Sequence, residues 1–238
     1  MSDAHVRKRL RELAQRYELP AQAPHQLAHL LEIVAQDPLA PTAVRAPEEA
    51  VDAHVADALV ALDLPPLREA GTIADLGSGA GFPGLVLAAA LPSAHVWLVE
   101  SNGRKCSFLS RAIAELGLHN ADAVPERAEA WDAGMVACDV VAARALAPLN
   151  VLVEYAAPLL REGGSLVAWK GQRDESEESD GVAAAAATGL ELLSVRPVRP
   201  WETAENRHLH LYLKVGSTPN RYPRRPGIAS KRPLRALT

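Results

Sequence analysis

The sequence predicts an α/β fold with a mostly parallel sheet and a helical segment in front of it. From residue 72 onward, short apolar runs alternate with stretches of helical periodicity, as in parallel strands joined by crossover helices. Glycines at three alternate positions follow the first of these runs, where an open α/β sheet binds its ligands. The 238 residues, of which 48% are hydrophobic, suffice for one such domain with an appendage.

The first third of the chain is expected to be helical. Apolar residues recur at helical spacing in three stretches that prolines separate: Val6, Leu10, Leu13 and Tyr17; Leu27, Leu30, Leu31 and Val34; Val51, Val55, Leu59 and Leu62. We therefore predict that residues 1–66 form a helical cap packed on the domain that follows.

We predict that residues 67–216 form the sheet domain. Strands are expected at 72–76, 95–100, 121–124, 139–144 and 165–170, and the helices between them near 84–91, 103–117 and 149–161. An alanine-rich helix and two final strands, 190–198 and 208–215, follow an acidic stretch. Because the last run alternates apolar and polar residues, we expect a half-exposed edge strand, with His208 and His210 on its exposed face.

Five alternating units ending in a hairpin-like pair outline the class I SAM-dependent methyltransferase fold, a Rossmann-like seven-stranded, mostly parallel sheet (SAM is S-adenosyl-L-methionine). No apolar run approaches the roughly 20 residues that span a bilayer, and the charged start is unlike a secretory signal. Cys106 and Cys138 are too few for a disulfide scaffold or a four-thiolate site, and the eight histidines lack metal-ligand spacing. We expect a monomeric cytoplasmic protein without a metal, with both cysteines in its core.

The glycine-rich loop has the sequence DLGSGAGFPG. Gly77, Gly79 and Gly81 allow a sharp turn and a close approach of the backbone to a ligand. Phe82 stands where a dinucleotide-binding loop has its third glycine, which favours SAM over NAD; a plain strand-to-helix turn is the alternative. Asp75 either orients this loop or meets the positively charged amino-acid end of SAM.

Two further strand ends carry candidate cofactor contacts. Glu100 follows Gly77 by 23 positions, where a carboxylate accepts hydrogen bonds from both ribose hydroxyls; an ordinary exposed acid is the alternative. Ala128 and Glu129 follow the third strand, where such folds meet the adenine ring, although a surface helix explains them equally well.

Arg144 and Lys170 end the fourth and fifth predicted strands. An arginine among apolar neighbours is costly unless it pairs with a carboxylate or an anionic ligand, so both a substrate-orienting role and a structural salt bridge stay open. Lys170 is an equally open candidate for contact with a substrate phosphate or base. An Asn-Pro-Pro-aromatic motif and a Pro-Cys motif are both missing, which disfavours methylation of an exocyclic amine and a pyrimidine-attacking thiolate. No residue is assigned as an acid or base.

The C-terminal tail, residues 217–238, holds six Arg or Lys and no acid. The net charge of the whole chain is −4, so the other residues together carry a net charge of −10. Prolines keep the tail extended, which suits contact with phosphates and an irregular RNA surface; a tether over the sheet edge is the alternative. The candidate RNA contacts are Arg221, Tyr222, Arg224, Arg225, Lys231 and Arg232.

Several segments resemble one family. DLGSGAGFPGLVLA, VES, ERAEAW, ARALAPL, WKGQ and RYPRRPGIASKRPL are similar to the glucose-inhibited division protein B family, ribosomal RNA small-subunit methyltransferase G, from about residue 40 to the C-terminus. The resemblance implies SAM-dependent methylation at N7 of a guanine in 16S rRNA. It also implies the following cofactor contacts: Gly77, Phe82, Glu100, Ser101, Asn102, Ala128, Glu129 and Arg144.

The N-terminal third departs from the family. Where family members often carry a Trp-Asn pair, this chain has Ala35-Gln36, and where they carry an Asn-Leu-Thr turn it has Ala40-Pro41-Thr42. Ala58 stands where the family usually has a serine. Four other residues of this segment do match the family: Arg45, Glu49, His54 and Asp57. The implied chemistry needs no general base, because guanine N7 carries a free lone pair. A small-molecule methyltransferase and a non-catalytic ribosome-assembly factor are the competing hypotheses.

Overall fold

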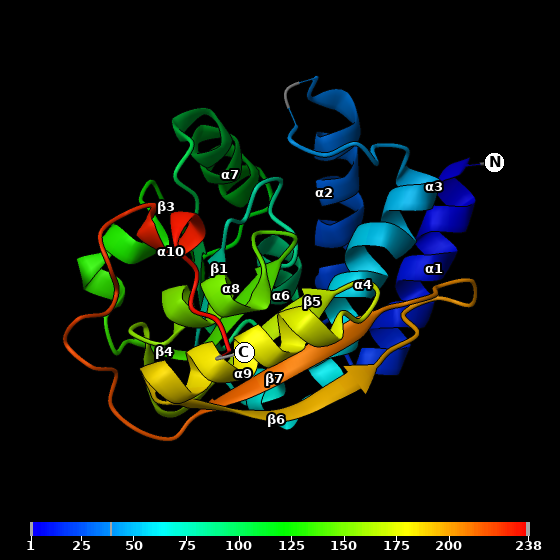
Figure 1. Cartoon of the computed structure of the whole chain (residues 1–238). Helices are drawn as coiled ribbons and strands as arrows, with labels where there is room; N and C mark the ends of the chain where they lie inside the picture. The colour runs from blue at the N-terminus through cyan, green and yellow to red at the C-terminus, as the bar shows by residue number, and fades with distance from the viewer. Residues whose placement is uncertain (1, 39, 237–238) are drawn as a thin grey trace.

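The computed structural model describes residues 2–38 and 40–236. Its centre is a seven-stranded sheet in the order β3-β2-β1-β4-β5-β7-β6 (Figure 1). Strands β1 to β5 run parallel, whereas β7 is antiparallel to both of its neighbours. The strands are β1 (Thr72–Leu76), β2 (His95–Val99), β3 (Ala121–Val124), β4 (Cys138–Arg144), β5 (Leu160–Lys170), β6 (Leu190–Pro197) and β7 (His208–Lys214).

Helices cover both faces of the sheet, and successive strand residues serve the two faces in turn. Ile73 belongs to the apolar cluster on the side of the N-terminal helices, whereas Ala74 belongs to the cluster on the other side. The first cluster includes α6 (Gly84–Ala90) and α7 (Gly103–Glu115). The second includes α8 (Leu149–Ala156), α9 (Glu175–Thr188) and α10 (Ile228–Lys231).

The N-terminal segment is helical, as predicted, and shares its apolar cluster with α6, β1 and β2. Two regular helices, α1 (Ser2–Tyr17) and α2 (Ala23–Gln36), come first. A run of short turns follows: α3 (Pro47–Ala50), the π-helical η1 (Val51–Ala56), α4 (Asp57–Leu59), the 3₁₀ turn η2 (Val60–Asp63) and α5 (Pro65–Arg68). Val51, Val55 and Leu59 are fully buried along this run.

The last strand in sequence is not an edge strand, and this prediction was wrong. β7 lies between β5 and β6, and β6 forms the edge. His210 is only 1% exposed, so it does not lie on a solvent face; its Nε2 donates to Glu178 Oε1 of α9 at 3.2 Å. His210 can be buried because α9 supplies a carboxylate for its ring, and the alternation within a single strand cannot reveal a partner on another element.

Two boundaries also differ from the prediction. β5 begins at Leu160, five residues early, and pairs with β4 through an irregular register near Cys138. Helix α8 therefore ends at Ala156 instead of near 161. Both Cys106 and Cys138 are buried, as expected. Within residues 2–38 and 40–236, no helix is long and apolar enough to cross a membrane, and no group of acidic, histidine or cysteine side chains could hold a metal ion.

Candidate functional site

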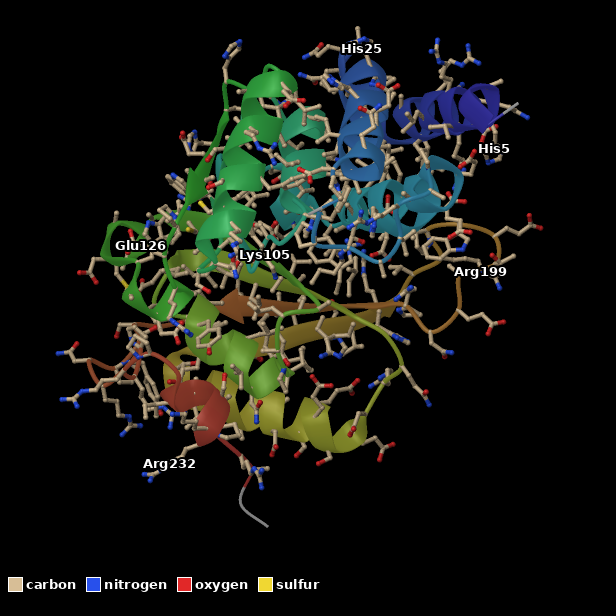
Figure 2. All side chains as sticks on the ribbon, turned by 90° about the horizontal axis from the view of Figure 1, so that it is seen from above. His5, His25, Lys105, Glu126, Arg199 and Arg232 are labelled. Carbon is tan, nitrogen blue, oxygen red and sulfur yellow. The ribbon has the colours of Figure 1, made fainter. Side chains whose placement is uncertain are left out.

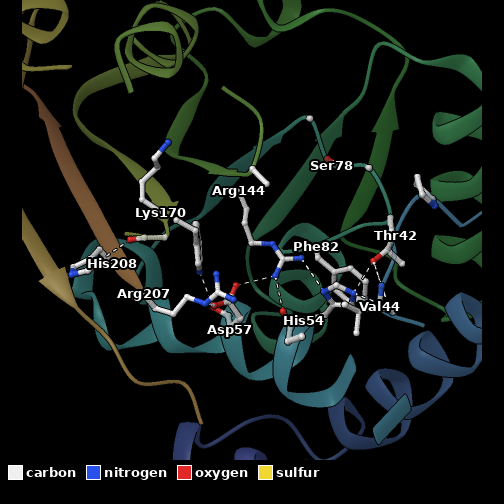
Figure 3. A pocket seen from close by; sticks show the side chains of 18 of the residues that line it. Thr42, Val44, His54, Asp57, Ser78, Phe82, Arg144, Lys170, Arg207 and His208 are labelled. Carbon is white, nitrogen blue, oxygen red and sulfur yellow. Dashed lines mark hydrogen bonds and ion pairs between the residues drawn. The ribbon is translucent and has the colours of Figure 1, made fainter. Parts of the chain in front are cut away.

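A cavity of about 540 Å³ opens at the carboxyl ends of β1, β4 and β5 (Figure 3). The glycine-rich loop forms one wall, and the turn before α3 together with η1 and α4 forms another. Arg144 and Lys170 line it from the ends of β4 and β5, and Arg207 and His208 from the β6–β7 hairpin. Lys105, at the start of α7, completes the rim (Figure 2).

The glycine-rich loop requires glycine for two different reasons. Gly77, Gly79 and Gly81 all have positive φ, at +68°, +55° and +90°. A Cβ on Gly77 or Gly81 would lie 2.5 Å or 2.3 Å from a leucine side chain, whereas a Cβ on Gly79 would meet only the Gly77 carbonyl oxygen, at 3.7 Å. Gly79 thus faces open space in the cavity, as a residue that a ligand approaches closely should.

Asp75 organises the loop from beneath and does not line the cavity. Its side chain is 1% exposed, and its Oδ2 accepts a hydrogen bond from the Gly84 backbone NH at 3.0 Å. Its carbonyl oxygen accepts from Ser78 Oγ at 2.8 Å. Burial raises the pKa of Asp75 to about 7. Of the two roles expected for this residue, the geometry favours loop orientation.

Glu100 ties the loop to the end of β2. Its Oε2 accepts from the Gly79 NH at 3.2 Å and its Oε1 from the Asn102 NH at 2.8 Å. Asn102 caps α7 by accepting from the Arg104 and Lys105 NH groups, while Ser101 is exposed. Each carboxylate oxygen of Glu100 keeps a lone pair for a further donor.

Ala128 and Glu129 lie in a single 3₁₀ turn, η3 (Ala128–Ala130), beyond the cavity. Ala128 is buried in the apolar cluster with Trp131. Glu129 Oε1 accepts from the backbone NH of Gly227, in the C-terminal tail, at 2.9 Å. The expected adenine end is therefore in contact with the tail.

Arg144 is both ion-paired and exposed to the cavity. Its Nη1 donates to Asp57 Oδ2 at 2.9 Å and to the Ala53 carbonyl at 3.1 Å, and its Nη2 lies 3.2 Å from His54 Nδ1. The guanidinium carbon is 5.7 Å from the centre of the Phe82 ring, on which the His54 imidazole stacks at 4.3 Å. The two roles left open for Arg144 are thus compatible.

His54 is held as the neutral tautomer with its proton on Nε2. A guanidinium only donates, so Nδ1 must accept from Arg144. The Nε2–H then faces the Val44 carbonyl at 3.1 Å and Thr42 Oγ1 at 3.0 Å. Burial, and then the positive charge of Arg144, lower the pKa of His54.

Lys170 is engaged with α9 instead of the Arg144 cluster. Its Nζ lies 2.5 Å from Glu177 Oε1, the oxygen that also accepts from the Leu149 NH. Figure 3 shows the lysine side chain turned away from Arg144 and Asp57.

The sequence did not single out several residues that line the cavity, among them Trp169 and Arg207. Trp169 Nε1 donates to the Asp57 carbonyl at 2.7 Å. Arg207 Nε lies 3.9 Å from Asp57 Oδ1, and its guanidinium stacks 5.6 Å from the Trp201 ring centre. Trp169 belongs to the WKGQ segment, whose resemblance to the family could have drawn attention to it. No motif in the sequence marks Arg207, which reaches the cavity only because it directly precedes β7 in the folded sheet.

The tail is docked on the body, which changes the reading of two candidate RNA contacts. Arg224 pairs in bidentate fashion with Glu154 of α8, whose carboxylate is 1% exposed, at 2.7 and 2.5 Å. Tyr222 is buried and Arg221 covers its ring, so it offers no free stacking face. The exposed members of the set are Arg221, Arg225, Lys231 and Arg232; Figure 2 shows Arg232 projecting outward.

Solved structures with the same architecture define the class. The chain aligns with the fibrillarin pre-rRNA processing protein of Methanococcus jannaschii (TM-score 0.54, 18% identity, 68% of this chain and 74% of that one). It also aligns with the mitomycin 7-O-methyltransferase MmcR (TM-score 0.58, 15% identity, 81% and 67%). The fold is that of the class I SAM-dependent methyltransferases.

Sequence relatives narrow the class to one family. Residues 26–209 match the profile of GidB, rRNA small subunit methyltransferase G. The ribosomal RNA small subunit methyltransferase G of Rubrobacter xylanophilus is 46% identical over 197 residues, covering 80% of this chain and 76% of the relative. That of Pelotomaculum thermopropionicum is 40% identical over 200 residues, covering 81% and 82%. The chain belongs to the rRNA small subunit methyltransferase G family, and the resemblance seen in its sequence is confirmed.

Proposed function

We propose that this protein transfers a methyl group from SAM to N7 of a guanine in 16S rRNA. The observation that carries the proposal is the cavity in which the glycine-rich loop faces the Arg144–Asp57–His54 cluster, in a chain whose relatives are named as rRNA small subunit methyltransferases. The 16S rRNA or the small ribosomal subunit would be the partner, and the cytoplasm the compartment.

The residues at the sheet edge fit SAM. Gly79 leaves room for a ligand that a side chain would fill. Glu100 has unused acceptor capacity beside that glycine, which suits a ribose diol. Ala128 and Glu129 would meet the adenine ring, and Phe82 and Arg144 would bound the methionine end. When bound, SAM supplies a methyl group on a sulfonium centre.

The cavity residues orient the reactants and do not move protons. His54 has both ring nitrogens in hydrogen bonds, and Asp57 is bound to Arg144, so neither is a free base. Guanine N7 needs none, because its lone pair is not protonated at neutral pH. Arg144 and the buried wall behind it hold the base in line and exclude water, which is where the rate gain would arise.

Methylation of small ribosomal subunits from a strain lacking this gene tests the proposal. Labelled SAM should place label in 16S rRNA, and mass spectrometry of the nucleosides should find 7-methylguanosine at one site. Binding of SAM without transfer to subunits would favour the small-molecule alternative.

The assembly-factor alternative needs a separate variant. Gly77→Arg should abolish SAM binding, since even a Cβ there overlaps Leu146. A strain with this variant and an unchanged cellular phenotype would favour the non-catalytic role, whereas loss of the modification with the phenotype of the null strain supports the enzyme.

A further inference from the structure

The buried Glu154 carboxylate receives its partner from the tail. Glu154 is 1% exposed, and the guanidinium of Arg224 approaches it with two parallel hydrogen bonds. A buried carboxylate is strongly unfavourable without such a partner. The pair therefore fixes the tail on α8 at residue 224.

The same stretch of tail is fixed at three more points. Ser230 Oγ and the Tyr155 hydroxyl of α8 lie 3.1 Å apart. The Gly227 NH donates to Glu129 Oε1. Ala229 is buried in the apolar cluster that also contains Ala128. Residues 224–230 consequently bridge α8 and the turn η3.

We propose that the Glu154–Arg224 pair is a latch that positions Ala128 and Glu129 for the adenine ring, so that the tail is part of the cofactor site. This inference rests on the proposed function, which assigns the adenine end to η3. The latch acts through Gly227 and Ala229, and neither Glu154 nor Arg224 touches the cofactor.

A docked tail also couples two ligands. Arg225, Lys231 and Arg232 are exposed on the segment whose inner side holds Glu129. RNA that binds the outer side would stabilise the docked tail and with it the cofactor site, and the coupling is reciprocal. SAM affinity should then rise when the small subunit is bound.

Calorimetric titration of SAM into the full-length protein without RNA tests the latch. Arg224→Met should raise the Kd of SAM at least about fivefold. Arg224→Lys keeps the positive charge but cannot make two parallel hydrogen bonds, so its Kd for SAM should lie between those of Arg224→Met and the wild type. Arg235→Met alters an exposed tail arginine and is the matched control, with an unchanged Kd. Circular dichroism of each variant reports the folded fraction, which a purely structural role would lower without changing the Kd of folded molecules.

A double variant covers the case in which Arg224→Met does not fold. Glu154→Gln with Arg224→Gln leaves no unpaired buried charge, so it should fold while holding the tail less firmly and binding SAM more weakly. An unchanged SAM Kd in a folded latch variant overturns the inference. A wild-type protein that binds SAM but methylates no rRNA would overturn the proposed function instead. The effect of the latch on the Kd of SAM could still be measured in that case, because the titration contains no RNA.

Discussion

Asp57 is the residue on which the cavity wall depends. The residue is 5% exposed, and its carboxylate lies between two guanidinium groups, at 2.9 Å from Arg144 and 3.9 Å from Arg207. Asp57→Ala should lower the free energy of unfolding by about 3 kcal/mol, because it removes the buried carboxylate that pairs with the partly buried Arg144, and should release Arg144 from its place in the cavity.

Urea unfolding and methyl transfer to small subunits measure the two effects. Asp52→Ala removes the carboxylate of a half-exposed pair with Arg9 and should cost under about 1 kcal/mol, with methylation retained. Equal losses in the two variants would contradict the special place given to Asp57.

The neutral His54 predicts a pH effect. Its folded pKa is lowered, so between the ordinary value of about 6.5 and the folded value, the unfolded chain binds a proton that the folded protein does not. Stability therefore falls as pH falls through this window and is complete above it. His54→Phe keeps the stacking on Phe82 and should flatten the dependence.

The measurement is the free energy of unfolding at pH 7.5 and at pH 5.5. His210 has a lowered pKa for the same reason, so only the difference between wild type and His54→Phe isolates His54. Parallel curves for the two proteins would show that His54 is not the titrating group.

Gly79 and Gly81 should separate binding from folding. Gly79→Ala costs about 1 kcal/mol for its left-handed backbone, yet its methyl group projects into open space. The folded variant should lose at least about tenfold in SAM affinity. Gly81→Ala overlaps the buried Leu85 side chain and should lose about 3 kcal/mol of stability.

Calorimetry with SAM and thermal unfolding would distinguish the two glycine variants. A Gly79→Ala protein that binds SAM as the wild type does would place the ligand elsewhere.

The apolar residues around Arg144 predicted that this arginine needs an anionic partner, but they did not indicate that the partner is Asp57. Asp57 is 87 residues away in the chain and lies in a helical run whose apolar residues dominate its pattern. Arg207, the second guanidinium beside Asp57, comes from yet another element, just before β7. Residues on separate elements meet through packing, and a single sequence shows each only in its local setting.

At the scale of elements, Lys214 of β7 holds two helices by their carboxyl ends. Its ammonium donates to the Ala157 carbonyl after α8 at 2.7 Å, to the Thr188 carbonyl of α9 at 3.3 Å, and to Thr218 Oγ1. Burial lowers the pKa of Lys214 to about 8, so the group is charged at neutral pH. Cations at helix C-termini are favourable.

Lys214→Met should therefore destabilise the fold. The apolar stem is kept, but buried carbonyl groups lose their donor, at a cost of about 2 kcal/mol. Urea unfolding at pH 7 measures the change, with Lys8→Met, on the exposed side of α1, as the control. A loss no greater than that of Lys8→Met would show that water replaces the ammonium.

Strands β1 and β4 were located well because their apolar runs are buried along most of their length and are bounded by turns. β7 was predicted at the wrong place in the sheet because an alternation of apolar and polar residues has two explanations. The polar residues can face solvent, or they can be buried against polar partners on another element. Lys214 and His210 are both buried, and their hydrogen-bond partners come from the end of α8, from α9 and from the tail. Strand order in a sheet is a property of the packed molecule.

At the scale of the whole molecule, the charge distribution predicts a small RNA footprint. The body carries −10 and the tail +6, so phosphate contacts should concentrate on the exposed tail arginines and lysine. Replacing Arg225, Lys231 and Arg232 by Gln should make the slope of log K against log salt shallower by about 2.

Binding of small subunits at several salt concentrations gives this slope. SAM affinity without RNA should be kept, because these side chains are exposed. An unchanged slope would place the RNA contacts on another surface.

The position of β7 has a consequence for synthesis. The strand that joins β6 to the rest of the sheet is the last to be made, and the hairpin before it also meets the start of the chain, where Arg9 donates to the Pro200 carbonyl, 191 positions away. Such distant contacts form late. A nascent chain therefore cannot assemble the cavity until β7 and the residues just before it, which line the cavity, have cleared the ribosomal exit tunnel.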